Sequence, residues 1–341
     1  MIRLKDVSFT YLSSAKEGAL HGVSLDIRHG ECMLLCGESG CGKTTLTRLI
    51  NGLIPHFYEG ELQGEIWVDG RSIPETQLYE LAGVCGTVFQ NPRSQFFNVD
   101  TTGEIAFGPE NLGLPEEEIL SRMGSVAREM KVQHLLGRSI FKLSGGEKQK
   151  IACASVAALR PEIYVLDEPS SNLDRAAVAD LRHHIALWKS QGKTIIIAEH
   201  RLHYLRGLCD RVLYLSKGVI EGEYTWKEFE RIPAEQRSAM GLRVLSLDEL
   251  RETQNVSANH GDDVLELSNF IYTYKRGQKA MDIPSLTLFK GGTIAIVGLN
   301  GAGKSTFARC LCGLNKRFRG TLTLNGRALV SGARRKKCFM V

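Results

Sequence analysis

The sequence predicts an α/β fold with a mixed sheet at its core, flanked by an antiparallel β subdomain and a helical subdomain. Three observations support this. Short apolar runs with the length of buried strands alternate with helical segments, a glycine-rich loop follows the first of these runs, and the residues before it alternate between apolar and polar. The antiparallel layer is therefore expected first along the chain, followed by the sheet core.

The glycine-rich loop joins a predicted strand to a predicted helix. It fits the pattern G-x-x-x-x-G-K-[ST], with the apolar run Cys32–Cys36 before it and the helical stretch Thr45–Ile50 after it. In such a loop the backbone N–H groups and the helix N-terminus point at phosphate groups. We expect Lys43 to reach the β- and γ-phosphates of a nucleotide and the Thr44 hydroxyl to ligate Mg²⁺. The expected nucleotide-binding residues are Gly37, Ser39, Gly40, Gly42, Lys43, Thr44 and Thr45.

Length and composition exclude several classes of protein. The 341 residues suffice for about two domains, and a content of 43% hydrophobic and 24% charged residues is globular. The net charge is +5, with four basic residues in the single run 334–337, so no nucleic-acid partner is predicted. The nine cysteines form no CxxC pair, which predicts a reduced, intracellular compartment. No apolar run approaches the ~18 residues of a membrane span, so any span would come from another chain.

The opening of the chain predicts an antiparallel layer beside the phosphate loop. Leu4–Tyr11 and Gly22–Ile27 both alternate like half-exposed strands. Tyr11 has two interpretations, because its ring either presents a face to a nucleotide base or simply packs against neighbouring side chains.

Two further strands and a helical region are predicted after the first helix. Gly64–Gly70 ends in Asp-Gly, and Gly83–Gln90 leads into a polar loop. Gln90 is either an ordinary loop residue or, if the strand end faces the nucleotide, a residue that helps to bind Mg²⁺ or positions water. The spacing over 101–138, interrupted by Pro and Gly, predicts a small helical subdomain.

The sequence Leu143–Glu147, LSGGE, opens another helix over Lys148–Leu159. Ser144, Gly145 and Gly146 at a helix N-terminus predict a second anion site without a lysine of its own. Two phosphate-binding loops of different type imply that one of them faces the nucleotide of a neighbour.

Two more buried strands end in polar groups. Ile163–Glu168 is an apolar run closed by Asp167 and Glu168, and phosphoryl transfer to water needs one carboxylate for Mg²⁺ and another to orient or deprotonate the water. Thr194–His200 is the next strand, and we expect His200 to contact a γ-phosphate, although a lone histidine is more often structural.

Taken together, these motifs resemble ATP-binding-cassette (ABC) ATPases, a P-loop NTPase family, in identity and in order along residues 1–230. The resemblance implies ATP and Mg²⁺ as cofactors, with Tyr11 stacking on adenine and Asp167 and Gln90 at the metal. It also implies Glu168 as general base and His200 at the γ-phosphate. Two such domains are expected to close head to tail, so that ATP lies between the phosphate loop of one and the LSGGE of the other.

A narrower similarity lies in three segments. Phe89–Phe97, Ala106–Leu114 and Glu199–Leu202 resemble the ATPases of energy-coupling-factor transporters, which import vitamins or transition-metal ions. This resemblance implies two membrane partners, a transmembrane coupling protein and a small membrane protein that captures substrate, with the coupling protein bound near residues 95–97. It places the protein at the cytoplasmic face of the cell membrane, as a peripheral subunit.

The sequence then repeats itself. Leu267–Tyr274 is similar to Leu4–Tyr11, an expected strand Thr293–Val297 precedes a second phosphate loop, and Gly320–Gly326 is similar to Gly64–Gly70. The second loop predicts nucleotide-binding residues at Gly298, Asn300, Gly301, Gly303, Lys304, Ser305 and Thr306.

The sequence predicts three parts: a complete cassette over 1–235, a linker over 236–262, and the N-terminal part of a second, truncated cassette over 263–341. No second LSGGE, carboxylate pair or switch histidine follows the second phosphate loop. We therefore expect hydrolysis to require self-association or a second ABC ATPase domain from a partner. Two alternatives stay open: a soluble tandem ABC ATPase acting on ribosomes or DNA, and a non-hydrolytic nucleotide-binding fragment.

Overall fold

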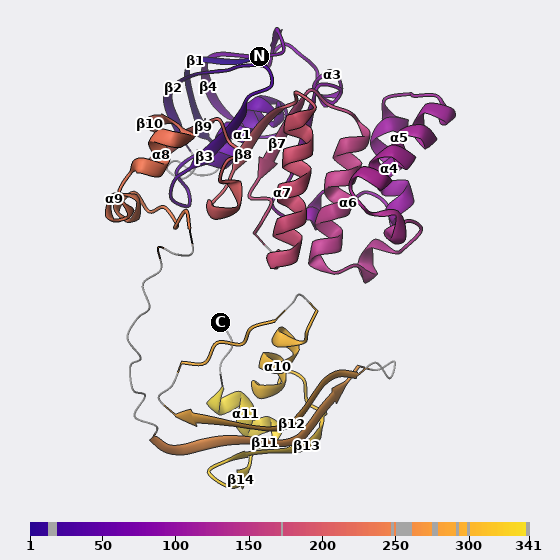
Figure 1. Cartoon of the computed structure of the whole chain (residues 1–341), viewed down its shortest axis with the longest axis vertical. Coiled ribbons are helices and arrows are strands. Elements are labelled where there is room, and N and C mark those ends of the chain that lie inside the picture. The colour runs from indigo at the N-terminus through magenta and orange to yellow at the C-terminus, as the bar shows by residue number, and fades with distance from the viewer. Residues whose placement is uncertain are drawn as a thin grey trace. The chain divides into compact units, whose positions relative to one another are not determined.

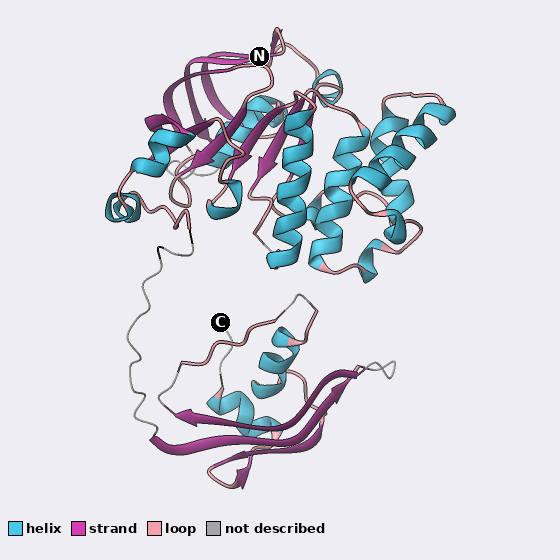
Figure 2. Cartoon of the chain, in the orientation of Figure 1, coloured by secondary structure: helices cyan, strands magenta, loops and turns pink. Residues whose placement is uncertain are grey.

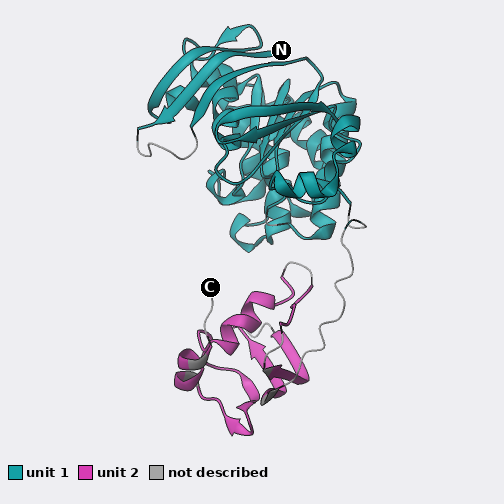
Figure 3. Cartoon of the chain, turned by 90° about the vertical axis from the view of Figure 1, so that its left-hand side faces the viewer, with its two compact units in different colours: residues 1–251 teal, residues 252–341 magenta. Residues whose placement is uncertain are grey.

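A computed structural model divides the chain into two compact units, residues 1–251 and 252–341 (Figure 3). The structure describes residues 1–12, 19–171, 173–246, 249, 261–274, 279–290, 293–298 and 301–338.

The first unit contains most of the regular structure (Figure 1). Its strands are β1 (Ile2–Tyr11), β2 (Leu20–Ile27), β3 (Cys32–Cys36), β4 (Gly60–Val68), β5 (Arg71–Ser72), β6 (Cys85–Val88), β7 (Ile163–Asp167), β8 (Thr194–Ala198), β9 (Arg211–Ser216) and β10 (Val219–Thr225). Its helices are α1 (Lys43–Ile50), α2 (Leu53–His56), α3 (Leu78–Ala82), α4 (Thr101–Asn111), α5 (Glu116–Glu129), α6 (Gly145–Ala158), α7 (Arg175–Ser190), α8 (Trp226–Arg231) and α9 (Ala234–Ala239).

A mixed sheet in the order β10-β9-β3-β8-β7-β6 forms the centre of this unit. Strands β3, β6, β7, β8 and β9 run parallel to one another, and β10 runs antiparallel to β9. Because parallel strands share one direction, the segments that follow β3, β7 and β8 all emerge at the same edge of the sheet. That edge brings together the phosphate loop, the carboxylate pair and His200.

Both faces of this sheet are covered, which explains the unbroken apolar runs of its strands. Along β3, Cys32, Leu34 and Cys36 pack into a core with α6 and α7, while Met33 and Leu35 pack into a second core with α1 and the N-terminal strands. All five side chains are fully buried. The sheet edge that carries the site is therefore held between two packed layers.

The antiparallel layer and the helical region match the sequence analysis. Strands β1 and β2 pair antiparallel, and the layer has the order β2-β1-β4-β5. Helices α4, α5 and α6 pack together beside the sheet (Figure 1). Helix α6 begins at Gly145, before the predicted start at Lys148, because the Ser144 hydroxyl accepts from Glu147 N and the Glu147 carboxylate accepts from Ser144 N.

The first unit extends past the predicted end at 235. Helix α9 and the buried side chain of Leu245 pack with this unit, and the buried Arg237 donates to Ile232 O and pairs with Glu249. The predicted linker over 236–262 therefore includes ordered residues, because the apolar side chains of this stretch pack against the core and the ion pair joins two parts of the stretch itself. No helix in the described residues is long and apolar enough to span a membrane.

The second unit repeats the antiparallel layer of the first. Its sheet has the order β12-β11-β13-β14, and its core is formed by Leu267, Phe270, Phe307, Cys310, Leu322 and Leu329. The elements are β11 (Gly261–Thr273), β12 (Lys279–Lys290), α10 (Lys304–Leu311), β13 (Arg319–Leu324), β14 (Arg327–Ala328) and α11 (Ser331–Lys337).

The predicted strand Thr293–Val297 is wrong, since residues 293–298 carry no regular secondary structure (Figure 2). Its counterpart β3 is paired on both sides, by β8 and β9, whereas no strand in the described part of the second unit pairs with 293–297. A strand needs a partner for its backbone N–H and C=O groups. The apolar side chains are also uncovered, with Val297 86% exposed, beside a cavity of about 920 Å³ lined by β12 and α10.

This difference predicts contrasting hydrogen exchange at two equivalent segments of one chain. We expect the amides of 293–297 to exchange at least about a thousandfold faster than those of β3, because the first have no ladder and the second open only with the core. Exchange of the full chain followed by mass spectrometry measures both segments in the same sample. Equal protection would mean that a partner strand covers 293–297 in solution.

Candidate functional site

The phosphate loop connects β3 to α1 through backbone conformations that only glycine adopts readily. Gly37 has φ 145° and Gly42, the N-cap of α1, has φ 107°. A Cβ atom on Gly37 would lie 2.1 Å from the carbonyl oxygen of Leu215, so any side chain there would collide with β9. The loop therefore lies tightly against the sheet, at the N-terminus of α1.

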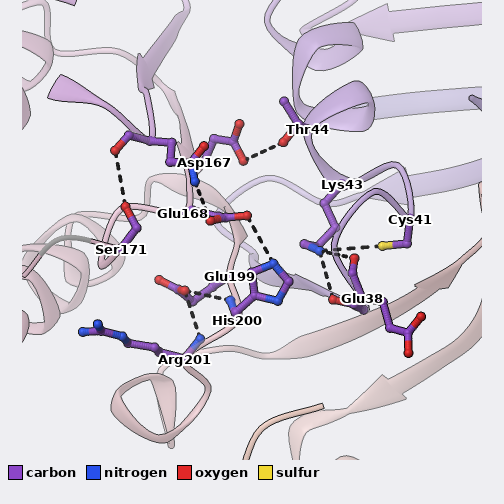
Figure 4. A network of polar contacts seen from close by, with 12 residues as sticks. Glu38, Cys41, Lys43, Thr44, Asp167, Glu168, Ser171, Glu199, His200 and Arg201 are labelled. Carbon is purple, nitrogen blue, oxygen red and sulfur yellow. Dashed lines mark hydrogen bonds and ion pairs between the residues drawn. The ribbon is translucent and has the colours of Figure 1, made fainter. Parts of the chain in front are cut away.

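Lys43 lies inside the loop and is 5% exposed. Its Nζ donates to Gly37 O at 2.9 Å and to Glu38 O at 2.8 Å, and it lies 3.7 Å from Cys41 Sγ (Figure 4). A buried ammonium group needs such acceptors. An ammonium group has three N–H donors, so a phosphate oxygen bound in the loop could replace one of these carbonyl groups as acceptor.

Thr44 and Asp167 lie next to each other across the site. The Thr44 hydroxyl donates to Asp167 Oδ1 at 3.2 Å. Burial raises the pKa of the Asp167 carboxyl, and the Thr44 hydrogen bond opposes that rise. A hydroxyl and a carboxylate are oxygen ligands of the kind that Mg²⁺ prefers, and Mg²⁺ sites commonly use one carboxylate and complete their shell with water and phosphate. In the described residues no group of three or more His, Cys, Asp or Glu side chains is placed to hold a metal ion by itself.

Glu168 contacts the two other predicted catalytic residues, Gln90 and His200. His200 Nε2 lies 3.2 Å from Glu168 Oε1, and Gln90 Nε2 donates to Glu168 Oε2 at 2.8 Å. The contact with His200 holds the pKa of the Glu168 carboxyl below its usual range. Glu168 also has φ 45°, a left-handed backbone conformation that costs a non-glycine residue free energy and is concentrated at functional sites. The structure thus joins Gln90, Glu168 and His200 at the end of the sheet.

The hydroxyl of Tyr11 forms hydrogen bonds with two residues of α1. Tyr11 OH donates to Thr45 Oγ1 at 3.3 Å and accepts from Arg48 Nη1 at 2.9 Å. The Arg48 guanidinium also stacks over the Tyr58 ring, 3.9 Å from its centroid. The ring of Tyr11 meets Phe9 edge to face, with ring centroids 4.8 Å apart. Stacking of Tyr11 on adenine stays a prediction, and the sequence analysis missed Arg48 as the residue that holds Tyr11.

The LSGGE residues form the start of α6. Ser144 is its N-cap, and Ser144 and Gly145 are exposed. A Cβ atom on Gly146 would lie 3.1 Å from Ala177 Cβ, so the glycine permits the close approach of α7. Among the described contacts, no hydrogen bond or ion pair links Ser144 to the phosphate loop of the same chain. This second predicted anion site lies at an exposed helix N-terminus.

The second phosphate loop repeats the geometry of the first. Gly301 and Gly303 have φ 83° and 94°, and Gly298 has φ 152°. Lys304 Nζ donates to Gly298 O at 2.7 Å, as Lys43 does to Gly37 O, and Tyr274 OH lies 2.8 Å from Thr306 Oγ1. Ser305 follows Lys304 in the first turn of α10, and the predicted residue Asn300 lies outside the described residues.

One buried acid of the site was missed as a functional residue. Glu199 is 2% exposed and accepts hydrogen bonds from the backbone of His200 and Arg201 (Figure 4). A carboxylate directly after the apolar strand β8, and directly before the histidine, was the available signal.

This chain is similar in sequence and in fold to known proteins. A family model described as ABC transporter matches residues 20–171 and 281–340. A protein of Treponema denticola named as an ABC transporter ATP-binding protein is 48% identical over 346 residues, covering 100% of this chain and 70% of that protein. A protein of Methanosarcina acetivorans with the same name is 32% identical, and the alignment covers 96% of this chain and 60% of that protein.

Solved structures show the same fold. The structure of cbiO1 from Clostridium perfringens, described as part of the ABC transporter complex cbiONQ, is 27% identical and has a TM-score of 0.60. It covers 70% of this chain and 93% of the cbiO1 chain. The predicted α/β fold, with its mixed sheet, antiparallel layer and helical region, is therefore confirmed.

Proposed function

Because this chain belongs to the ABC transporter family, whose ATP-binding proteins are ATPases, we propose that it drives a membrane importer of the energy-coupling-factor type. The family assignment makes the chain an ATP-binding ATPase subunit. Beyond this assignment, we propose the kind of transporter, the metal and the partners. The observation that carries the ATPase chemistry is the convergence of Lys43, Asp167, Glu168 and His200 at one edge of the sheet.

Each of these residues has a part in hydrolysis that follows from its geometry. Lys43 and the loop N–H groups bind the β- and γ-phosphates, and Thr44 and Asp167 supply oxygen ligands that suit Mg²⁺. When bound, Mg²⁺ supplies charge neutralisation at the phosphates. Glu168 is ionised at neutral pH and accepts a proton from the attacking water, while Gln90 and His200 orient its carboxylate from either side.

The importer assignment rests on the loop that follows Gln90. Phe97 is 75% exposed and stacks on Phe107 with ring centroids 4.9 Å apart. Both rings border a cavity of about 360 Å³ that also reaches Phe89 and Leu159. An exposed aromatic ring stacked on a half-buried one beside a hollow fits an apolar helix end, and we assign this surface to the transmembrane coupling protein. The resemblance of Phe89–Phe97 to energy-coupling-factor ATPases and the cbiO1 neighbour support the same partner.

A charge placed on this surface tests the proposal. We expect F97D to abolish co-purification with membrane proteins after mild detergent extraction, because burying an unpaired carboxylate in an apolar contact costs several kcal/mol. The matched control is L120D, which places the same charge on an exposed apolar residue of α5. Turnover of the purified F97D chain should equal wild type. If membrane proteins co-purify equally with both variants, or with neither F97D nor wild type, the importer assignment fails.

ATP-binding cassettes of this family dimerise and work with transmembrane partners, and we extend this to the second unit. We propose that residues 263–341 are the N-terminal part of a second cassette, joined to the first by the segment around 236–262. In this proposal the exposed Ser144 and Gly145 face the phosphate loop of another cassette, and the loop at Lys43 receives the LSGGE of another cassette. Hydrolysis then requires that two cassettes associate.

A further inference from the structure

Glu199 is a carboxylate buried where no cation contacts it through a described hydrogen bond or ion pair. Its four acceptor contacts all come from neutral donors: His200 N at 2.7 Å, Arg201 N at 2.9 Å, Tyr204 OH at 2.9 Å and Ser170 N at 3.3 Å. Burying a charge costs free energy even when it is hydrogen-bonded. A residue that only filled space at the end of β8 would not need to be an acid.

The two oxygens of Glu199 reach different loops. Oε1 accepts from the two consecutive N–H groups of His200 and Arg201, and so closes the turn that follows β8. Oε2 accepts from Ser170 N, in the loop that follows Glu168, and from Tyr204 OH. One side chain therefore joins the segment that carries His200 to the segment that follows the general base.

Neighbouring contacts complete this junction. Glu168 N donates to Ala198 O at 2.8 Å, and Glu199 N donates to Leu35 O at 3.1 Å, which ties three strand ends together. The Arg201 guanidinium donates to Leu173 O at 3.1 Å, on the same loop as Ser170. Within this frame His200 Nε2 is held 3.2 Å from Glu168 (Figure 4).

We propose that Glu199 is a positioning residue for ATP hydrolysis, which clamps the loop of His200 to the loop that follows Glu168 and so fixes the contact between His200 and Glu168. This inference rests on the proposed hydrolysis, and it adds a buried residue whose described hydrogen bonds all go to the protein itself. The isosteric change E199Q keeps the shape and replaces an acceptor oxygen by an NH₂ group, which faces N–H donors and cannot accept from them.

The test is a mutant cycle on the 341-residue chain. ATP affinity and the single-turnover rate with radiolabelled ATP, which detects very slow hydrolysis, are measured for wild type, E199Q, H200A and E199Q/H200A. We expect E199Q to slow hydrolysis by about tenfold to a hundredfold, since a misplacement near 1 Å has effects of this size, and to leave ATP affinity within about twofold. In the H200A background E199Q should cause no further loss, because its effect passes through His200.

A matched control separates positioning from general stability. Glu31 is another buried carboxylate, 8% exposed, which accepts from Arg28 N and pairs with Arg211 at the start of β3. E31Q should leave the hydrolysis rate unchanged. An equal loss in E199Q with and without His200, or wild-type hydrolysis in E199Q, overturns the proposal.

Two further measurements decide the outcome if E199Q is unstable or if wild type does not hydrolyse ATP. Y204F removes a single bond to Glu199 Oε2, and its loss of rate should also disappear in H200A. Hydrogen exchange needs no turnover: either variant should speed exchange in 168–173 and 199–204 together and leave β8 protected. Unchanged exchange in both loops overturns the clamp, whereas absent hydrolysis in wild type at concentrations where two cassettes associate overturns the proposed function alone.

Discussion

Replacing Glu168 by Gln is expected to lower ATP turnover by about a hundredfold to ten-thousandfold, the range that a positioned general base contributes. The contact with His200 lowers the pKa of the Glu168 carboxyl below its usual range, and glutamine cannot accept the proton of the attacking water. ATP binding should persist, because Lys43 and the loop N–H groups are unchanged. Steady-state turnover and equilibrium binding on the same preparation measure both quantities.

The same variant tests self-association. If ATP lies between two chains, wild-type turnover should rise more steeply than protein concentration, and E168Q should accumulate a species of twice the mass when ATP is added. The matched control is E162Q. Glu162 is an exposed carboxylate at the opposite end of β7, and it pairs with Lys193 at 2.7 Å. It should behave as wild type. Full turnover by E168Q would remove Glu168 from the chemistry, and concentration-independent turnover by a proven monomer would remove the requirement for a second chain.

Replacing Lys43 by Ala is expected to weaken ATP binding by about tenfold to more than a hundredfold and to abolish measurable turnover. A hydrogen bond from a charged donor contributes about 1.5–3 kcal/mol, and Lys43 is positioned to donate to more than one phosphate oxygen. Titration calorimetry with ATP gives the affinity, and the melting temperature with and without ATP gives an independent measure of binding.

The control for K43A is K5A. Lys5 is an exposed lysine on β1 that pairs with Glu65 at 3.9 Å, and exposed pairs of this kind contribute little. K5A should bind and hydrolyse ATP like wild type. If K43A retained wild-type affinity while folded, the first loop would not be the nucleotide site, and the comparable loop at Lys304 would become the one to test by K304A.

The sequence alone identified seven strands of the first unit and the loops of its site, because local chemistry defines them, but it did not identify β5, β9 or β10. A strand buried on both faces, such as β3, must be apolar throughout, and a turn such as Gly37 tolerates no side chain. The start of α6 was displaced in the prediction, since the capping box that begins the helix depends on reciprocal bonds between Ser144 and Glu147.

The error at Thr293–Val297 has a different cause. The segment has the apolar pattern of a strand, but a strand exists only where another strand pairs with it, and pairing is a property of the assembled sheet. The same pattern at Cys32–Cys36 forms β3 because β8 and β9 lie on either side.

What the sequence determined, then, was which residues are chemically competent: the lysine in a glycine-rich loop, the paired carboxylates and the histidine after a buried strand. Only the tertiary structure decided how they meet. Glu168 contacts Gln90 and His200 because β6, β7 and β8 are parallel neighbours that end at one edge, and Glu199 links two loops because folding buries its carboxylate between them. Such contacts join residues far apart in the chain, so no local pattern encodes them.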